Sequence, residues 1–364
     1  MEEYPMLGKI LKNGITEYIY PVEGLEDNNF LALTVKAGSA VEEEYNAGIA
    51  HFVEHAQMSF FDEREEAYRC FAYTNFYSTT FYFDVKTYAM DRVADLVQGI
   101  ISGKFLKKVD IEKVRKEVLR EYKNMINKNH ESDFRILLEN SEYASHYAIG
   151  TRECINNFSL NDIWKFYKIF YLLGNMCIIW IGPEKDIKET GTEWIKKLSG
   201  IQGNTKLRIL EYAFPLKKVK VPKCGGERTD YYFFRKRKER QDTIDEVLLF
   251  ILEEILNQYA GNIQVEKIYL SCQQEFIHIV SWEKNKDWNE IYKIIEEISW
   301  ADWMDKYKNF FKKQLIGYNC DLLREQFVNV FIFDGLLTEQ RPSIKKEMLK
   351  LMKLLKTSPV IISK

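Results

Sequence analysis

The order of strand-like and helical segments, which runs through the chain twice, constrains its fold more than any other feature. In the first half, residues 14–22 and 28–39 are rich in β-branched and aromatic residues and are bounded by Gly, Asn and Asp, as strands are. A clear helical pattern follows at 110–127. The second half repeats this style, with a strand at 230–238 and a long helix at 243–261. We therefore expect an α+β protein of two similar domains, each a mostly antiparallel sheet with helices packed on one face.

The boundary between these domains is expected at residues 206–228, which contain Pro, Gly and Lys and show no clear period. This linker would separate a first domain at 1–205 from a degenerate, shortened second domain at 229–364. The length of 364 residues is sufficient for about two domains with their own cores.

Charge and composition limit the partners and the compartment. The 52 basic and 54 acidic residues nearly balance, so the sequence favours neither nucleic acid nor an anionic membrane as a partner. The basic cluster at 235–240 has no interleaved aromatic residues and is typical of the solvated end of a strand. We see no secretory signal and no apolar run of about 18 residues. The six scattered cysteines lack a C-x-x-C pair, which favours free thiols and a cytoplasmic protein.

The short motif HFVEH contains two of the five histidines in the chain. On a helix, steps of about 100° place His51, Glu54 and His55 on one side, with Phe52 and Val53 facing a core on the other. Two imidazoles spaced i, i+4 can bind one metal ion, and nitrogen ligands suit zinc. Glu54 would then be available as a general base. The alternative is an ordinary helix face with a Glu–His ion pair.

A catalytic zinc usually has three protein ligands, so a third must come from elsewhere. The helix expected at 110–127 offers Glu117 and Glu121, which fall four residues apart on the side of its apolar stripe. A carboxylate in such a stripe costs free energy unless a partner compensates its charge, as a metal ion would. The residues alone do not choose between Glu117 and Glu121.

Four ordered segments resemble the M16 metallopeptidases, the inverzincins that include pitrilysin, insulin-degrading enzyme and the mitochondrial processing peptidase. The first is VKAGSAVEEEYNAGIAHFVEH, which is similar to the family's strand, turn and zinc helix in that order. FAYTNFYSTTFYFDV, VRKEVLRE and the run from YAIGTRE to WIGP follow. The resemblance covers at least residues 13–185 and implies the fold of one half of an M16 clamshell.

The resemblance also implies roles for the site residues. His51 and His55 match the histidine ligands of one zinc ion per chain, and Glu54 matches the base. Glu121 matches the glutamate ligand, which leaves Glu117 as a possible second carboxylate.

The resemblance further implies that a peptide substrate binds along an edge strand at Phe71, Ala72, Tyr73 and Thr74. Phe71 stands where the family has Asn, so altered subsites are expected. Val114 stands where the family often has another acid, which suggests weaker metal binding. The 66 positions from His55 to Glu121 are about ten fewer than the family usually shows, so one wall of the cleft is expected to be trimmed.

The opposite half of an M16 chamber usually supplies an Arg and a Tyr that bind the scissile carbonyl. Tyr269 is the nearest candidate for this oxyanion contact, but Asn262 stands where the Arg would be. We therefore expect a heterodimer with a paralogous M16-like subunit that supplies both residues.

Taken together, the residues and the resemblance predict a zinc metalloendopeptidase subunit that hydrolyses short unfolded peptides in a closed chamber. Leader peptides of ribosomally made natural products are one expected substrate class. The alternative is a catalytically inactive M16-like binding or scaffold subunit.

Overall fold

The computed structural model describes residues 9–23, 25–61, 66–127, 146–206, 229–236, 242–271, 274–282, 287–299, 302, 319–332, 344–357 and 360–363. The chain divides into two compact units, of which the first combines Met1–Lys217 with Ile316–Ile332. The second combines Lys218–Leu315 with Phe333–Lys364. Of the expected linker, residues 207–228 lie outside the described part.

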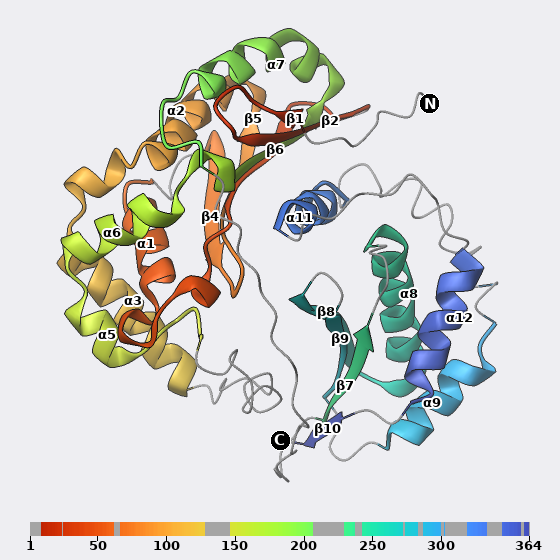
Figure 1. Ribbon diagram of the computed structural model, residues 1–364. Coiled ribbons are helices and arrows are strands. Elements are labelled where there is room, and N and C mark those ends of the chain that lie inside the picture. Colours follow the sequence, from red (N-terminus) through yellow and green to blue (C-terminus); the bar gives the residue numbers. More distant parts are fainter. Residues whose placement is uncertain are drawn as a thin grey trace. The chain divides into compact units, whose positions relative to one another are not determined.

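The first unit is built on a mixed sheet with the strand order β1-β2-β6-β3-β5-β4 (Figure 1). Its strands are β1 (Lys9–Ile10), β2 (Thr16–Val22), β3 (Asn28–Val35), β4 (Tyr68–Thr74), β5 (Thr79–Lys86) and β6 (Met176–Pro183). The β2–β6 pair is parallel and the other pairs are antiparallel. All eight residues of the apolar strand β6 are buried, as expected for a strand covered on both faces.

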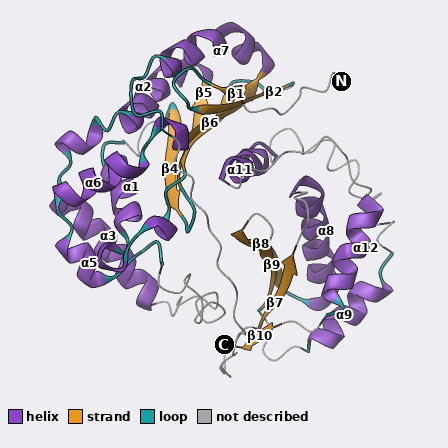
Figure 2. Ribbon diagram, viewed as in Figure 1, coloured by secondary structure: helices purple, strands orange, loops and turns teal. Residues whose placement is uncertain are grey.

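Two layers of helices cover one face of this sheet (Figure 2). The helices are α1 (Ile49–Met58), α2 (Met90–Ile101), α3 (Ile111–Asn127), α5 (Arg152–Asn157), α6 (Leu160–Phe170) and α7 (Glu184–Ser199). Short 3-10 turns complete the unit, namely η1 (Ser39–Val41), η2 (Glu44–Asn46), η3 (Thr87–Ala89), η4 (Phe105–Lys108) and η6 (Leu173–Asn175). α1, α2 and α7 contact the strands, while α3, α5 and α6 pack around α1. Val114 and Val118 of the predicted α3 stripe are fully buried in this core.

In the part of the chain that the structure describes, α11 (Asn319–Ile332) covers the other face of the same sheet and contacts β3 and β6. Its Arg324 is 2% exposed and donates from Nη1 to the carbonyls of Leu31 at 3.1 Å and Phe83 at 3.3 Å. The same nitrogen lies 3.0 Å from Asp84 Oδ1. The expectation of helices on only one face is therefore wrong for this sheet. The helix that covers the second face comes from the sequence range expected for the second domain.

The second unit contains an antiparallel sheet with the order β10-β7-β9-β8. Its strands are β7 (Thr229–Lys236), β8 (Ile263–Ser271), β9 (Gln274–Ser281) and β10 (Val360–Ser363), and its helices are α8 (Asp242–Ala260), α9 (Trp288–Glu297) and α12 (Ile344–Leu355). Tyr231, Phe233, Ile277 and Ile279 form its core with α8 and α9. Six mixed strands in one unit and four antiparallel strands in the other do not make two clearly similar domains.

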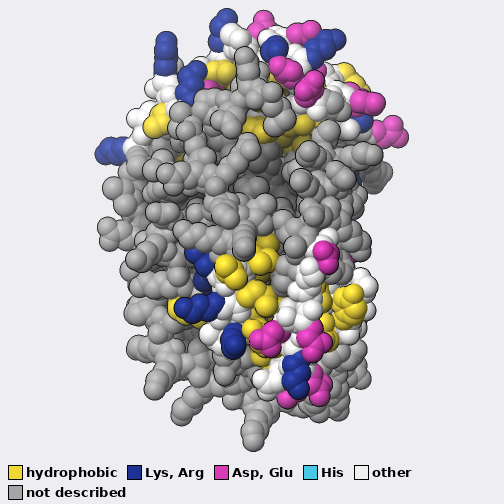
Figure 3. Space-filling view, turned by 90° about the vertical axis from the view of Figure 1, so that its right-hand side faces the viewer, with side chains coloured by type: hydrophobic (Ala, Val, Ile, Leu, Met, Phe, Trp, Pro, Cys, Tyr) yellow, Lys and Arg dark blue, Asp and Glu magenta, His cyan; other side chains and the backbone are white. Residues whose placement is uncertain are grey.

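Charged side chains of both signs are interspersed on the described part of the face in Figure 3, around hydrophobic side chains. No helix in the described ranges is both long enough and apolar enough to cross a bilayer.

Candidate metal centre

The helix that carries HFVEH begins at a position that requires glycine. Gly48 has a φ of +92°, and a Cβ atom there would lie 2.7 Å from the Cα atom of Gly150. The carboxylate of Glu42 accepts the N–H groups of Gly48 and Ala50, both at 2.8 Å. Glu42 is 4% exposed, so it caps two N–H groups that would otherwise be buried without a partner. His51 follows directly after this capped turn.

Burial raises the pKa of Glu42 to about 8, although the two N–H donors act in the opposite direction. Glu42→Gln keeps one acceptor oxygen but turns an NH₂ group toward the second N–H donor. We expect a loss of about 1–3 kcal/mol in the free energy of unfolding, the cost of a buried unsatisfied polar group. Urea unfolding of Glu42→Gln against Glu44→Gln, an exposed neighbour, measures it at about pH 9, where Glu42 is ionised. Equal midpoints for both variants would contradict the capping role.

Two histidines of α1 converge on one carboxylate of α3. Glu121 Oε2 lies 3.2 Å from His55 Nε2 and 3.5 Å from His51 Nε2. The candidate ligand atoms of the three residues all lie within 4.8 Å of one another, and this is the one such group in the described ranges. Zinc bonds of 2.0–2.1 Å in a tetrahedron place neighbouring ligand atoms roughly 3.3 Å apart. The donor set and its spacing therefore fit one zinc ion.

Glu117 does not join this group, because its carboxylate lies 4.0 Å from Lys113 Nζ on its own helix. The expectation that both glutamates are buried in the apolar stripe of α3 is wrong. The Glu117 and Glu121 side chains are 32% and 47% exposed. Convergence with the histidines, and not burial, distinguishes Glu121.

The protonation of the two histidines differs. Burial, with the neighbouring His55, lowers the pKa of His51 to about 4, so this imidazole is neutral and able to bind metal at physiological pH. Burial would also lower the pKa of His55. The hydrogen bond to Glu121 and the charges of Glu54, Glu121 and Glu117 outweigh it and raise that pKa above its usual value.

Wherever His55 is protonated, below its raised pKa, zinc binding must displace that proton. We expect zinc affinity to rise by up to about tenfold per pH unit through and above the usual histidine pKa of about 6.5, and to level off once His55 is neutral. Calorimetric zinc titrations in two buffers with different ionisation enthalpies count the released protons. A pH-independent affinity between pH 6 and 8 would contradict this account.

Glu54 lies on the same helix and is 6% exposed. It accepts a hydrogen bond of 2.6 Å from the hydroxyl of Thr74, the last residue of β4. Burial raises the pKa of Glu54 to about 7 against the opposing effects of this hydrogen bond and of His55. A carboxylate with such a pKa is suited to exchange protons near neutral pH.

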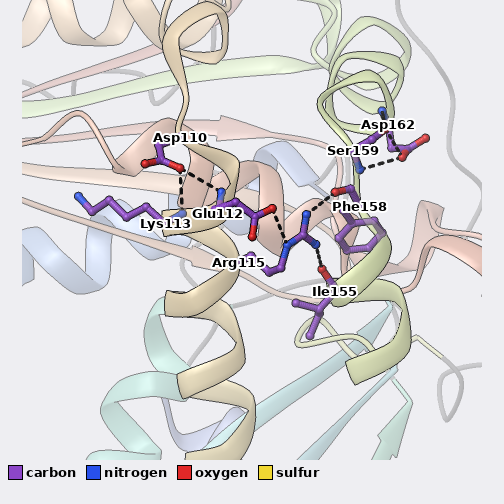
Figure 4. Close-up of polar contacts among 8 residues, drawn as sticks. All are labelled: Asp110, Glu112, Lys113, Arg115, Ile155, Phe158, Ser159 and Asp162. Carbon is purple, nitrogen blue, oxygen red and sulfur yellow. Dashed lines mark hydrogen bonds and ion pairs between the residues drawn. The ribbon is translucent and has the colours of Figure 1, made fainter.

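The first turn of α3, the helix that carries Glu121, is capped by a side chain (Figure 4). Asp110 accepts the N–H groups of Glu112 and Lys113, both at 3.1 Å. At the start of α6, Ser159 and Asp162 form a reciprocal capping box.

Arg115 joins α3 to the end of α5 (Figure 4). Its guanidinium group donates to the carbonyl of Ile155 and, at 2.8 Å, to that of Phe158, and it pairs with Glu112 at 3.3 Å. The same group lies 5.9 Å from the ring centre of Phe52 on α1. Arg115 thus ties the helix that bears Glu121 to its neighbours. Arg115 could not be recognised from the sequence, because the partners of its side chain are distant backbone carbonyls.

The remaining predicted residues are partly described. Phe71, Ala72, Tyr73 and Thr74 all lie on β4, the edge strand next to α1. Tyr269 lies on β8 of the second unit, and its side chain is outside the described part. Residues 62–65, which follow α1 where the trimmed wall was expected, are likewise outside it.

Known proteins share both sequence and fold with this chain. A sequence model of the family described as Insulinase (Peptidase family M16) matches residues 26–148. The chloroplastic stromal processing peptidase of Arabidopsis thaliana is 29% identical over 193 residues, which cover 49% of this chain and 15% of that protein. The chain thus spans a small part of this curated relative.

Two solved structures have the same fold. The periplasmic protease PqqL from Escherichia coli gives a TM-score of 0.70 at 16% identity, covering 100% of this chain and 48% of that chain. A peptidase M16 inactive domain from Pseudomonas fluorescens gives a TM-score of 0.65 at 11% identity, covering 98% of this chain and 97% of that chain. The chain therefore matches about half of the PqqL structure.

Proposed function

The chain belongs to the M16 peptidase family and matches one half of its two-half structures, and from this premise we propose that it is a zinc-dependent endopeptidase subunit. The convergence of His51, His55 and Glu121 beside the buried Glu54 carries the proposal. A fold shared with an inactive domain does not distinguish an enzyme from a scaffold, whereas this set of side chains favours the enzyme.

The roles follow from the positions of the side chains. His51, His55 and Glu121 would hold the zinc ion, which when bound supplies Lewis-acid chemistry that polarises the peptide carbonyl and acidifies water. Glu54 would accept a proton from the attacking water and return it to the leaving amine nitrogen. The hydroxyl of Thr74 holds the Glu54 carboxylate in place for this transfer.

The substrate would be a short unfolded peptide that adds as a further strand to the edge of β4. Leader peptides of ribosomally made natural products are such peptides. They are the substrate class of this proposal, since an unfolded segment can add to the edge of β4 as a strand.

The same proposal includes a paralogous M16-like partner subunit that supplies an Arg and a Tyr to bind the scissile carbonyl. Tyr269 is the candidate for an oxyanion contact from this chain. It also places the protein in the cytoplasm, where Cys70, Cys154, Cys177 and Cys320, which are free thiols, would stay reduced.

A catalytically inactive scaffold is the competing function, and one observation favours it. Val114, where many family members have an acid, is fully buried in the hydrophobic core, so no carboxylate supports the metal ligands from that position.

Zinc content and peptide cleavage, measured for the chain alone and with its paralogous partner, separate the two functions. If the chain is an enzyme subunit, it should bind about one zinc ion, and peptide cleavage should increase when the partner is added. Absence of cleavage in every pairing would establish the scaffold.

A further inference from the structure

The residues of β4 alternate between two faces of the sheet. Cys70 and Thr74 point toward α1, where they contact Met58 and Glu54. Phe71 and Tyr73 fall on the opposite face and are 48% and 61% exposed. The edge strand therefore presents two aromatic side chains at i, i+2 on the face away from the metal centre.

The ring of Phe71 is held in a stack. It lies 4.8 Å from the ring of Tyr82 on β5, with an interplanar angle of 13°. The guanidinium group of Arg324 lies 4.9 Å from the Tyr82 ring centre and 5.8 Å from those of Phe71 and Phe30. Arg324 is itself held by Asp84 and by two strand carbonyls, so the guanidinium group that lies beside both rings is fixed in place.

Single exposed aromatic residues are common on protein surfaces and need no ligand. Two observations distinguish Phe71. Its ring stacks on Tyr82 and lies beside the buried Arg324 guanidinium group, and these contacts order it before any ligand binds. It also lies three residues from Thr74, the partner of Glu54, which is roughly 10 Å along a strand.

We propose that Phe71 and Tyr73 form a specificity subsite that takes large apolar or aromatic side chains of the peptide substrate. The inference rests on the proposed function, in which a peptide strand adds to β4. Side chains of that strand directly opposite Phe71 and Tyr73 would lie about 4.5–5.5 Å away between Cβ atoms, where aromatic pairs are favourable. Preferred peptides would carry such residues at alternate positions, spaced i, i+2.

The test uses the zinc-loaded chain, with its partner if cleavage requires one, and peptides in which a single position is Phe, Leu, Ser or Asp. Wild type should prefer Phe over Ser by about tenfold in kcat/KM at one position, since a buried aromatic contact of about 1.4 kcal/mol corresponds to that ratio. Phe71→Ser should reduce this preference below about twofold, and Phe71→Leu should restore part of it. Zinc content should not change.

Tyr88→Ser is the matched control, because Tyr88 is an aromatic residue of the same unit that is 77% exposed and lies off β4. An unchanged preference in Phe71→Ser, with cleavage retained, would overturn the subsite. Binding of the same peptides to zinc-loaded Glu54→Gln, with and without Phe71→Ser, gives a second measurement. If wild type cleaves nothing, the proposed function fails. Binding still tests the subsite in that case. A tenfold preference for Phe in binding, removed by Phe71→Ser, would support the subsite. A lack of preference for Phe in binding would overturn it.

Discussion

Glu54→Gln is expected to lower the rate of peptide hydrolysis by about 10³-fold, within the range for loss of a general base. Glutamine fills the same space and can still accept the hydrogen bond from Thr74, so the fold and the site geometry should persist. It cannot accept the proton of the attacking water. Because Glu54 lies outside the group of candidate ligands, the zinc content should stay near one per chain.

The measurement is a single-turnover cleavage assay on wild type and Glu54→Gln, with zinc determined on the same samples. Loss of activity together with loss of zinc would show that Glu54 supports the metal and is not the base. Retention of more than about a tenth of the activity would contradict the role of Glu54 in proton transfer.

Glu121→Gln is expected to weaken zinc binding by at least about 100-fold, since loss of a ligand should exceed the effect of losing a supporting group. It removes the negative charge that both histidines approach at 3.2 and 3.5 Å. The amide is a poor ligand, and we expect its loss of affinity to outweigh the lower pKa of His55, which no longer has the hydrogen bond to Glu121. Activity should fall with the bound metal and return in part at high zinc concentration.

Glu117→Gln is the matched control, because it removes the same charge one turn earlier on the same helix. Competition with a fluorescent chelator gives the zinc dissociation constants of both variants. Weaker binding by Glu117→Gln than by Glu121→Gln would show that the other glutamate is the ligand.

The order of strands and helices from β2 to α7 follows from local patterns, and so do the three polar residues that α1 contributes to the site. His51, Glu54 and His55 are adjacent on one helix, so their common direction depends only on helix geometry. The choice of Glu121 over Glu117 required the packing of α3 on α1, and from the sequence it rested on resemblance alone.

The features that could not be predicted depend on contacts between distant parts of the chain. Arg324 lies 240 positions from Asp84, and its helix covers a sheet face on which no helix was expected. Glu42 lies outside α1 and is recognisable as its cap only when the loop brings its carboxylate to Gly48 and Ala50. The stack of Phe71 on Tyr82 depends on strand register in the same way.

Zinc stoichiometry tests the central claim most directly. Native mass spectrometry of the purified chain at pH 8 is expected to show about one zinc ion in wild type and none in His51→Ala. Wild type without bound zinc at any zinc concentration, or an equal amount of zinc in His51→Ala, would contradict the assignment of this site as the catalytic centre.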